Sequence, residues 1–228
     1  MISDFKQIES IFKEIDQYLK IKIRIYVIGG VVLLYKKLKP ATKDIDLIIL
    51  EKHEFVAFEQ ALKTVRFESK IPTGVYKKMN LNQILIRNDF RIDAFHKTVC
   101  RRFLLSEGMR KRAKKILELK HIDLYLCSNE DIFVFKTFTE REGDLQDCIA
   151  LAQRGLDWES ILSELQSQIH HSGEDVWITW IGERLDLLVE RGLSIPIMDQ
   201  IDKLRDTYLK DFEQKFLKKT KTKNFTEE

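Results

Sequence analysis

The chain has 228 residues, of which 44% are hydrophobic and 33% charged. This composition is typical of a folded globular protein and excludes a disordered or collagen-like chain. No apolar run approaches the roughly 20 residues of a membrane span, and the N-terminal residues do not have the pattern of a secretory signal. The three cysteines, Cys100, Cys127 and Cys148, are odd in number and widely spaced. We therefore expect a cytoplasmic protein with reduced thiols and no membrane association.

Charge is distributed unevenly along the chain. Residues 1–127 contain 26 Lys and Arg against 15 Asp and Glu, whereas residues 128–228 contain 13 against 21. The densest basic stretch runs from Lys97 to Lys120 and includes Arg101, Arg102, Arg110, Lys111, Arg112, Lys114 and Lys115. This pattern is compatible with binding of a polyanion such as RNA. A solvated helical face is the alternative.

The first part of the chain is predicted to alternate helices and strands. Ser3 is a candidate N-cap for an amphipathic helix that ends near Lys20. A strand over 24–28 leads through Gly29-Gly30 into a short helix over 31–38, and a strand over 44–50 leads into a helix over 54–65. Three further strands are predicted over 75–79, 83–87 and 90–95, the last two joined by a tight turn at Asn88-Asp89.

The second part of the chain is predicted to be helical. A last strand over 122–126 precedes Ser128, which caps a helix from 129 to about 140, and later glycines punctuate further amphipathic helices. Trp158, Trp177 and Trp180 are expected to anchor the core of this region, and residues 219–228 to be frayed. The fold class is therefore α+β: a mixed β-sheet core flanked by helices over 1–127, then an all-helical region over 128–228, with the boundary near 126–128.

Two aspartates lie on the second of these strands. Asp44 and Asp46 are two residues apart, so their side chains leave the same face, while Ile45 points into the core. Asp93 lies on another strand flanked by apolar residues. Carboxylate oxygens at short spacing suit Mg²⁺, so we expect the three acids to converge at one cleft. The alternative for each acid taken singly is an exposed strand residue or a turn cap.

Gly29-Gly30 follows a strand and opens a helix. Backbone N–H groups at such a position are able to meet phosphate oxygens without interference from a Cβ. A simple turn is the alternative, because glycine pairs commonly serve only to reverse the chain.

The order of these motifs resembles the nucleotidyltransferase superfamily that shares the DNA polymerase β catalytic core. The resemblance spans about residues 25–150: an apolar strand, Gly29-Gly30, an interval of thirteen residues, Thr42 with Asp44-Ile45-Asp46, and the later acid Asp93. It extends to the branch that includes toxin–antitoxin nucleotidyltransferases, through a later helix carrying Lys136, Arg141, Asp144 and Asp147. The chain departs from the usual pattern at Val31 and Pro40.

The resemblance implies transfer of a nucleoside monophosphate from a nucleoside triphosphate to a hydroxyl, with release of pyrophosphate. It implies two Mg²⁺ ions held by Asp44, Asp46 and Asp93, with Asp93 also helping to deprotonate the acceptor. Nucleotide contacts are expected from the following residues: Gly29, Gly30, Thr42, Lys136, Arg141 and Asp147. Asp144 and Asp147 have a second interpretation as caps of a helix after Gly143, and Lys136 as a lysine that extends to solvent.

The acceptor and the physiological role stay open in the sequence. An RNA end bound by the Lys97 to Lys120 stretch, a protein side chain and a small molecule are all compatible with the core. The alternative to an enzyme is a catalytically degenerate binding or regulatory module, such as a toxin–antitoxin component.

Overall fold

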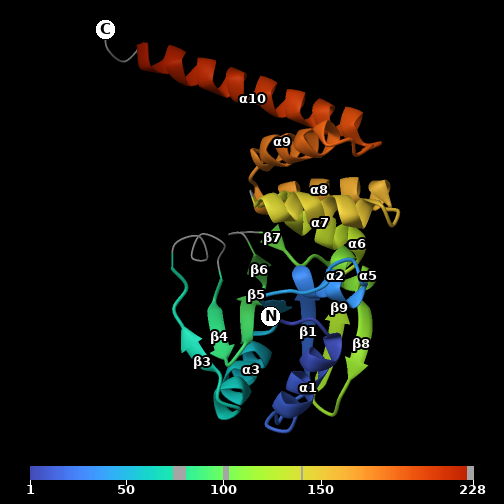
Figure 1. Cartoon of the computed structure of the whole chain (residues 1–228). Coiled ribbons are helices and arrows are strands. Elements are labelled where there is room, and N and C mark those ends of the chain that lie inside the picture. The colour runs from blue at the N-terminus through green and yellow to red at the C-terminus, as the bar shows by residue number, and fades with distance from the viewer. Residues whose placement is uncertain (74–80, 100–102, 140, 225–228) are drawn as a thin grey trace.

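A mixed sheet of seven strands forms the centre of the molecule (Figure 1). The computed structural model describes residues 1–73, 81–99, 103–139 and 141–224. The strand order is β3-β4-β5-β2-β1-β9-β8. The strands are β1 (Ile23–Ile28), β2 (Ile45–Ile49), β3 (Glu68–Lys70), β4 (Gln83–Arg87), β5 (Phe90–His96), β8 (Lys114–Glu118) and β9 (Ile122–Leu126), with a separate pair β6 (Thr98–Val99) and β7 (Phe103–Leu104). β1 runs parallel to β9 and antiparallel to β2, which confirms the predicted mixed sheet.

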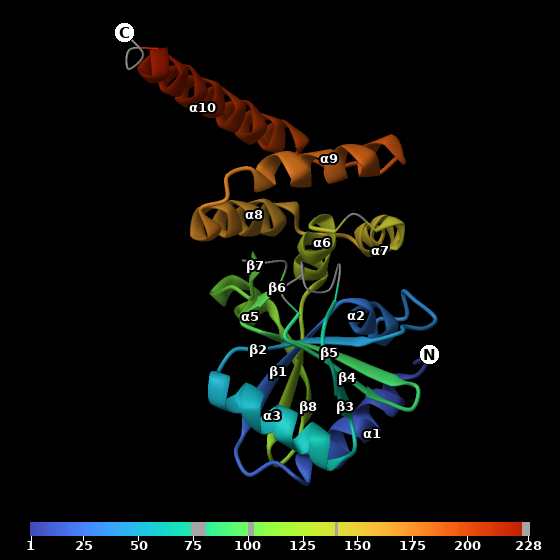
Figure 2. The ribbon, with the colours of Figure 1, turned by 90° about the vertical axis from the view of Figure 1, so that its left-hand side faces the viewer.

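Helices cover the sheet and then continue away from it in tiers (Figures 1 and 2). The core carries α1 (Phe5–Asp16), α2 (Gly30–Tyr35), α3 (Lys52–Thr64) and α5 (Glu107–Arg112). The C-terminal region consists of α6 (Asn129–Thr137), α7 (Glu142–Ala152), α8 (Trp158–Ser172), α9 (Trp177–Glu190) and α10 (Met198–Asn224). The α+β class with a helical C-terminal region is thus confirmed. In the described part of the chain, none of the helices combines the length and apolar character that crossing a membrane requires.

Helices α1 and α3 pack together against the sheet. The apolar stripe of α1 is buried, and the ring of Phe12 stacks on that of Phe58 from α3 with centroids 6.4 Å apart. The predicted N-cap Ser3 is wrong by one residue: Asp4 accepts from the backbone of Lys6 and forms a capping box. The helix also ends earlier than predicted, at Asp16, whose carboxylate accepts a hydrogen bond from the backbone N–H of His121.

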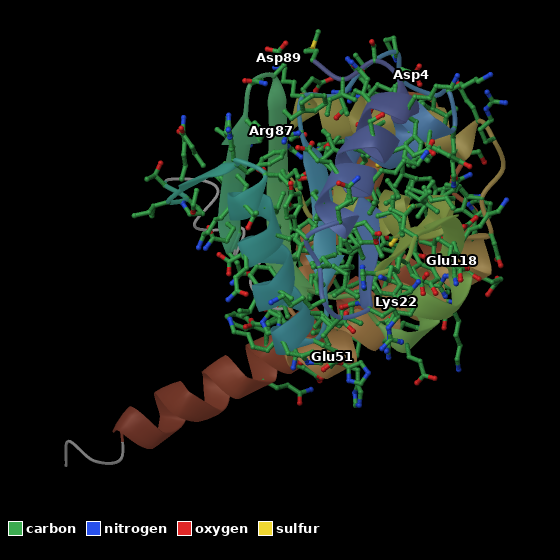
Figure 3. All side chains as sticks on the ribbon, turned by 90° about the horizontal axis from the view of Figure 1, so that it is seen from below. Asp4, Lys22, Glu51, Arg87, Asp89 and Glu118 are labelled. Atoms are coloured by element: carbon green, nitrogen blue, oxygen red, sulfur yellow. The ribbon has the colours of Figure 1, made fainter. Side chains whose placement is uncertain are left out.

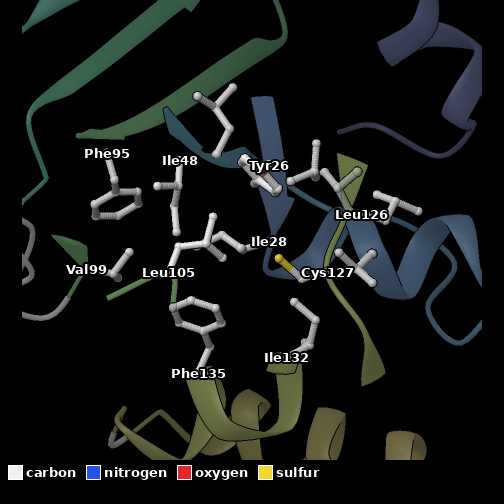
Figure 4. Packing of buried hydrophobic residues seen from close by; sticks show 14 of the residues in the cluster. Tyr26, Ile28, Ile48, Phe95, Val99, Leu105, Leu126, Cys127, Ile132 and Phe135 are labelled. Carbon is white, nitrogen blue, oxygen red and sulfur yellow. The ribbon is translucent and has the colours of Figure 1, made fainter. Parts of the chain in front are cut away.

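The hydrophobic core continues from the sheet into α6. Figure 4 shows Ile132 and Phe135 of α6 pointing toward Leu105, Cys127 and Ile28 at the strand ends. Burial of all five side chains joins the sheet and the helical region through one core.

The expectation for the tryptophans holds in part. Trp177 is buried and its ring meets that of Phe138 edge-on, with centroids 4.9 Å apart. Trp180, in contrast, is 52% exposed. It lies off the buried stripe of α9, which is formed by Ile178, Ile181, Leu185 and Leu188.

Several sequence predictions differ from the structure. The strand predicted over 75–79 lies outside the described residues. Gly143 does not break a helix but lies inside α7, and α10 continues to Asn224, so the expected fraying from residue 219 is wrong for 219–224. The basic stretch contains the unpredicted α5 and β8. β8 is an edge strand, where charged residues are tolerated because one side is open to water.

The end of the core opposite the helical tiers carries scattered charged residues. In the view from below, the labelled charged residues Asp4, Lys22 and Glu118 are spread apart, and α10 extends past the core (Figure 3). Arg87 at this end pairs with Glu14 of α1, with N–O distances of 2.7 and 2.8 Å.

Candidate active site

Three carboxylates meet at the centre of the sheet. Asp46 of β2 and Asp93 of β5 are register partners on parallel neighbouring strands, so their side chains leave the same face. Asp44 precedes β2 by one residue and shares that face. Each residue offers an oxygen within 4.8 Å of the others. The convergence predicted from the sequence is therefore observed.

Burial makes this acidic cluster costly in the absence of a cation. Asp93 is 3% exposed, and Asp46 is half-buried. Burial raises the pKa of Asp46 well above its usual value, and the neighbouring Asp44 and Asp93 raise it further. Burial also raises the pKa of Asp93, although Arg91 opposes this effect. The three carboxylates repel one another, and a bound cation would offset this repulsion. Carboxylate oxygens are ligands that fit Mg²⁺.

The two glycines border the cluster. Gly29 has φ +67°, and a Cβ placed on it would lie 2.2 Å from Oδ2 of Asp46. A Cβ on Gly30 would lie 2.5 Å from Oγ1 of Thr42. Both positions therefore require glycine, since a side chain would enter the space of a candidate site residue.

Thr42 packs against the glycine turn and is buried. The residue is 5% exposed, and its hydroxyl donates to the carbonyl of Asp44 at 3.2 Å. Its backbone forms a β-bridge with Ile2. In this structure Thr42 thus positions the backbone of Asp44.

Arg91 is a neighbour of the site that the sequence analysis missed. Its Nε and Nη2 each donate to one oxygen of Asp93 at 2.7 Å. Such a bidentate pair holds the carboxylate in one orientation. A signal was present in the sequence, because Arg91 and Asp93 are two residues apart on one strand and hence share a face.

A second cluster of charged residues joins Lys39, which follows α2, to four residues of the helical region. The Nζ of Lys136 is 2.7 Å from Asp144 and 2.7 Å from Asp147, and all three residues are buried. Arg141 donates through Nε to Asp144 at 2.8 Å, and Lys39 donates to both oxygens of Asp147 at 3.1 Å. We refer to these five residues as the charge cluster.

The charge cluster and the acidic cluster influence each other. The charges of Arg141 and Lys136 counteract the rise in the pKa of Asp46. Burial lowers the pKa of Arg141, but Asp144, Asp46 and Asp44 outweigh it, so the net shift is upward. The structure therefore brings the charges of Lys136 and Arg141 within electrostatic reach of Asp46, while Asp147 contacts Lys136.

Two interpretations of this segment are corrected. Arg141, not Asp144, is the N-cap residue of α7, and Asp144 instead binds Lys136, Thr139 and Arg141. Lys136 does not extend to solvent, because it is 6% exposed. The sequence analysis also missed Lys39, which lies 108 residues from Asp147 and gives no local signal.

Among the described residues of the basic stretch, several cations are paired with acidic side chains. Arg112 is bound to two buried carboxylates, Asp131 at 2.6 Å and Glu164 at 2.7 Å. Lys111 pairs with Glu107, and Lys115 with Glu118. Arg101 and Arg102 lie outside the described residues. Arg112 therefore joins α5 to α6 and α8 through its ion pairs.

Comparisons with known proteins identify a family and a similar fold. A family model described as nucleotidyltransferase of unknown function (DUF6036) matches residues 4–177. The solution structure of the antibiotic-resistance factor ANT(2″)-Ia is similar in fold, with TM-score 0.51 at 10% identity over 74% of this chain and 92% of that chain. The crystal structure of ANT(2″)-Ia in complex with adenylyl-2″-tobramycin gives TM-score 0.49 at 9% identity, over 73% and 97%. No curated protein sequence matches the chain significantly.

Proposed function

The chain belongs to the DUF6036 family of nucleotidyltransferases, and on that premise we propose that it transfers a nucleoside monophosphate from a nucleoside triphosphate to a hydroxyl group. In this reaction the acceptor oxygen bonds to the α-phosphorus, the bond to the bridging oxygen breaks, and pyrophosphate leaves. The observation that carries the proposal is the convergence of Asp44, Asp46 and Asp93 within 4.8 Å. Buried carboxyl groups whose pKa is raised, as it is for Asp46 and Asp93, are typical of catalytic sites.

Asp44, Asp46 and Asp93 are the residues that would hold two Mg²⁺ ions. Bound Mg²⁺ in such a site offsets phosphate charge and stabilises the attacking and leaving oxygens. Asp93 has a further role as acceptor of the hydroxyl proton. Its raised pKa favours that role, because a carboxylate with a higher pKa is a stronger base.

Other residues of the site would bind the nucleotide. Gly29 and Gly30 would offer the backbone N–H groups of a strand-to-helix turn to a phosphate, and the side chain of Arg141 is 63% exposed. This exposure supports a contact between Arg141 and the leaving pyrophosphate. Lys136 and Asp147 act through the charge cluster. Asp147 and Asp144 hold Lys136, whose positive charge favours binding of the triphosphate. Thr42 acts by fixing Asp44.

The acceptor is proposed as a hydroxyl of a small molecule or a protein side chain. Tobramycin belongs to ANT(2″)-Ia, whose likeness to this chain concerns the fold, so an aminoglycoside is one test compound among several. The matches name neither RNA nor a toxin–antitoxin partner, and the pairing of Arg112, Lys111 and Lys115 removes much of the argument for an RNA surface.

One observation favours a second candidate function. Arg91 occupies both oxygens of Asp93, the third of the three acids. If this pair persists when nucleotide binds, the chain is a nucleotide-binding module without turnover.

Radiolabel transfer tests the proposal. The full chain is incubated with each α-labelled nucleoside triphosphate, Mg²⁺ and panels of proteins, small hydroxyl compounds and RNA, and both labelled product and pyrophosphate are measured. Transfer is expected in the parent and in Asp89→Asn, whose carboxylate is exposed at the β4–β5 turn, and is lost in Asp93→Asn. Nucleotide binding without transfer supports the second candidate. Absence of nucleotide binding contradicts both.

A further inference from the structure

Helix α10 extends past the helix that supports it. Its first turns pack on α9, where Arg205 of α10 pairs with Asp186 at 2.9 Å. Arg205 also lies directly over Gly182 of α9, because a Cβ added to that glycine would be 2.6 Å from Cδ of the arginine. The two helices run in opposite directions (Figures 1 and 2). α9 begins at Trp177, five residues before Gly182, so its support ends about five residues after Arg205. α10 continues to Asn224.

The face of α10 that packs on α9 stays apolar beyond that point. Ile201 is fully buried, whereas Leu209 is 49% and Phe212 55% exposed. Phe212 follows Arg205 by seven residues and therefore lies on the same face. The sequence continues this spacing with Phe216. The apolar stripe of α10 is thus buried against α9 near Ile201 and exposed at Leu209 and Phe212.

Charge along α10 changes sign at the same place. Residues 199–213 contain five acidic residues, Asp199, Asp202, Asp206, Asp211 and Glu213, against three basic ones. Residues 214–224 contain five lysines and no acidic residue. A helix with one acidic and one basic half is complementary to a copy of itself that runs in the opposite direction.

We propose that the extension of α10 is a homodimer interface, in which two copies pair antiparallel about a two-fold axis near Phe212. The exposed stripe of each copy beyond α9 then packs against that of the other, and the lysine-rich end of each approaches the exposed Asp211 and Glu213 of its partner. One patch serves both sides, as a two-fold interface requires. The family match ends at residue 177, so this interface belongs to the part of the chain that follows the shared core.

The oligomeric state of the full chain tests the interface. We expect sedimentation velocity to show a concentration-dependent dimer in the parent. Phe212→Glu should weaken the dimer by roughly tenfold or more, since two glutamates would meet at the axis. The control is Thr207→Glu, which adds the same charge on the opposite face of α10. Thermal unfolding should be similar in both variants, because both replaced side chains are exposed.

A cysteine substitution tests the direction of pairing. Under oxidation, Phe212→Cys should form a disulfide-linked dimer and Thr207→Cys should not, with the parent measuring the background from native cysteines. A parent chain that stays monomeric at high concentration, or a dimer unaffected by Phe212→Glu, would overturn the proposal. So would cross-linking that is equal at positions 207 and 212.

Discussion

Gly29 and Asp46 are so close that a methyl group on the first would lie 2.2 Å from Oδ2 of the second. Gly29 directly follows β1, whose last residue, Ile28, is the register partner of Asp46 on the antiparallel strand β2. The glycine turn therefore sets the position of the carboxylate as well as the direction of the chain. This places a backbone constraint directly on the proposed metal site.

Gly29→Ala should displace Asp46 and weaken divalent cation binding by tenfold or more. Gly155→Ala is the matched control, because Gly155 also has positive φ (+80°) but an added Cβ meets nothing within 4 Å. Both variants should carry a backbone strain of about 1–2 kcal/mol. Mn²⁺ binding measured by calorimetry separates them. Equal affinity in the two variants would show that contact with Asp46 is unimportant.

Asp46→Asn should stabilise the metal-free chain at neutral pH. The folded-state pKa of Asp46 is raised above its usual 3.8. Between pH 3.8 and the raised value, the folded state therefore binds more protons than the unfolded state, and the free energy of unfolding falls as the pH rises. Asparagine removes this loss, and its advantage should disappear below pH 3.8. Thermal unfolding with a chelator across this range measures the effect. Added Mg²⁺ should stabilise the parent more than the variant, and the opposite ranking would contradict the metal site.

Arg91→Gln should tighten Mn²⁺ binding several-fold at pH 8. The guanidinium occupies both oxygens of Asp93 and repels a nearby cation, so its removal favours the metal. Arg87→Gln is the control, because Arg87 makes a similar pair with Glu14 at the far end of the sheet. Weaker Mn²⁺ binding in Arg91→Gln would mean that the arginine mainly orients Asp93 for the metal.

Lys136→Met should cost about 3 kcal/mol of stability, because it leaves Asp144 and Asp147 buried without their shared cation. Lys39→Met should cost about 1 kcal/mol or less, since the Lys39 side chain is 36% exposed. Urea unfolding gives both values. A small loss in Lys136→Met, together with reduced nucleotide use, would instead favour a direct contact with substrate.

The sequence predicts local features of the fold well. The strands over 83–87 and 122–126 are observed with those bounds, and the positive φ of Asn88 fits the predicted turn. Alternating hydrophobicity and turn residues are local signals, so the sequence of a single segment is enough to predict its strand or turn. β8 was missed because its charged residues are compatible with a strand only at a sheet edge, which the sequence of that segment does not reveal.

The residues of the candidate site likewise fall into those that local sequence signals predict and those that depend on tertiary packing. Asp44 and Asp46 share a face by strand periodicity, and Asp93 follows from its apolar surroundings. Lys39 could not be predicted, because its contact with Asp147 depends on how the helical region packs on the core. The burial of Lys136 has the same origin. The limits of the two proposed domains, 1–127 and 128–228, stay predictions.

The two edges of the large sheet have a consequence for association of the chain. At one edge, all three residues of β3, Glu68, Ser69 and Lys70, are exposed, and at the other edge β8 exposes Lys114, Lys115 and Glu118. Charged side chains on edge strands discourage the addition of another strand, because each new pairing would bring like charges together or remove them from water. The sheet is thereby protected against fibril-like growth. In the proposed dimer, copies of the chain associate through α10 instead, and a two-fold axis limits the assembly to two copies.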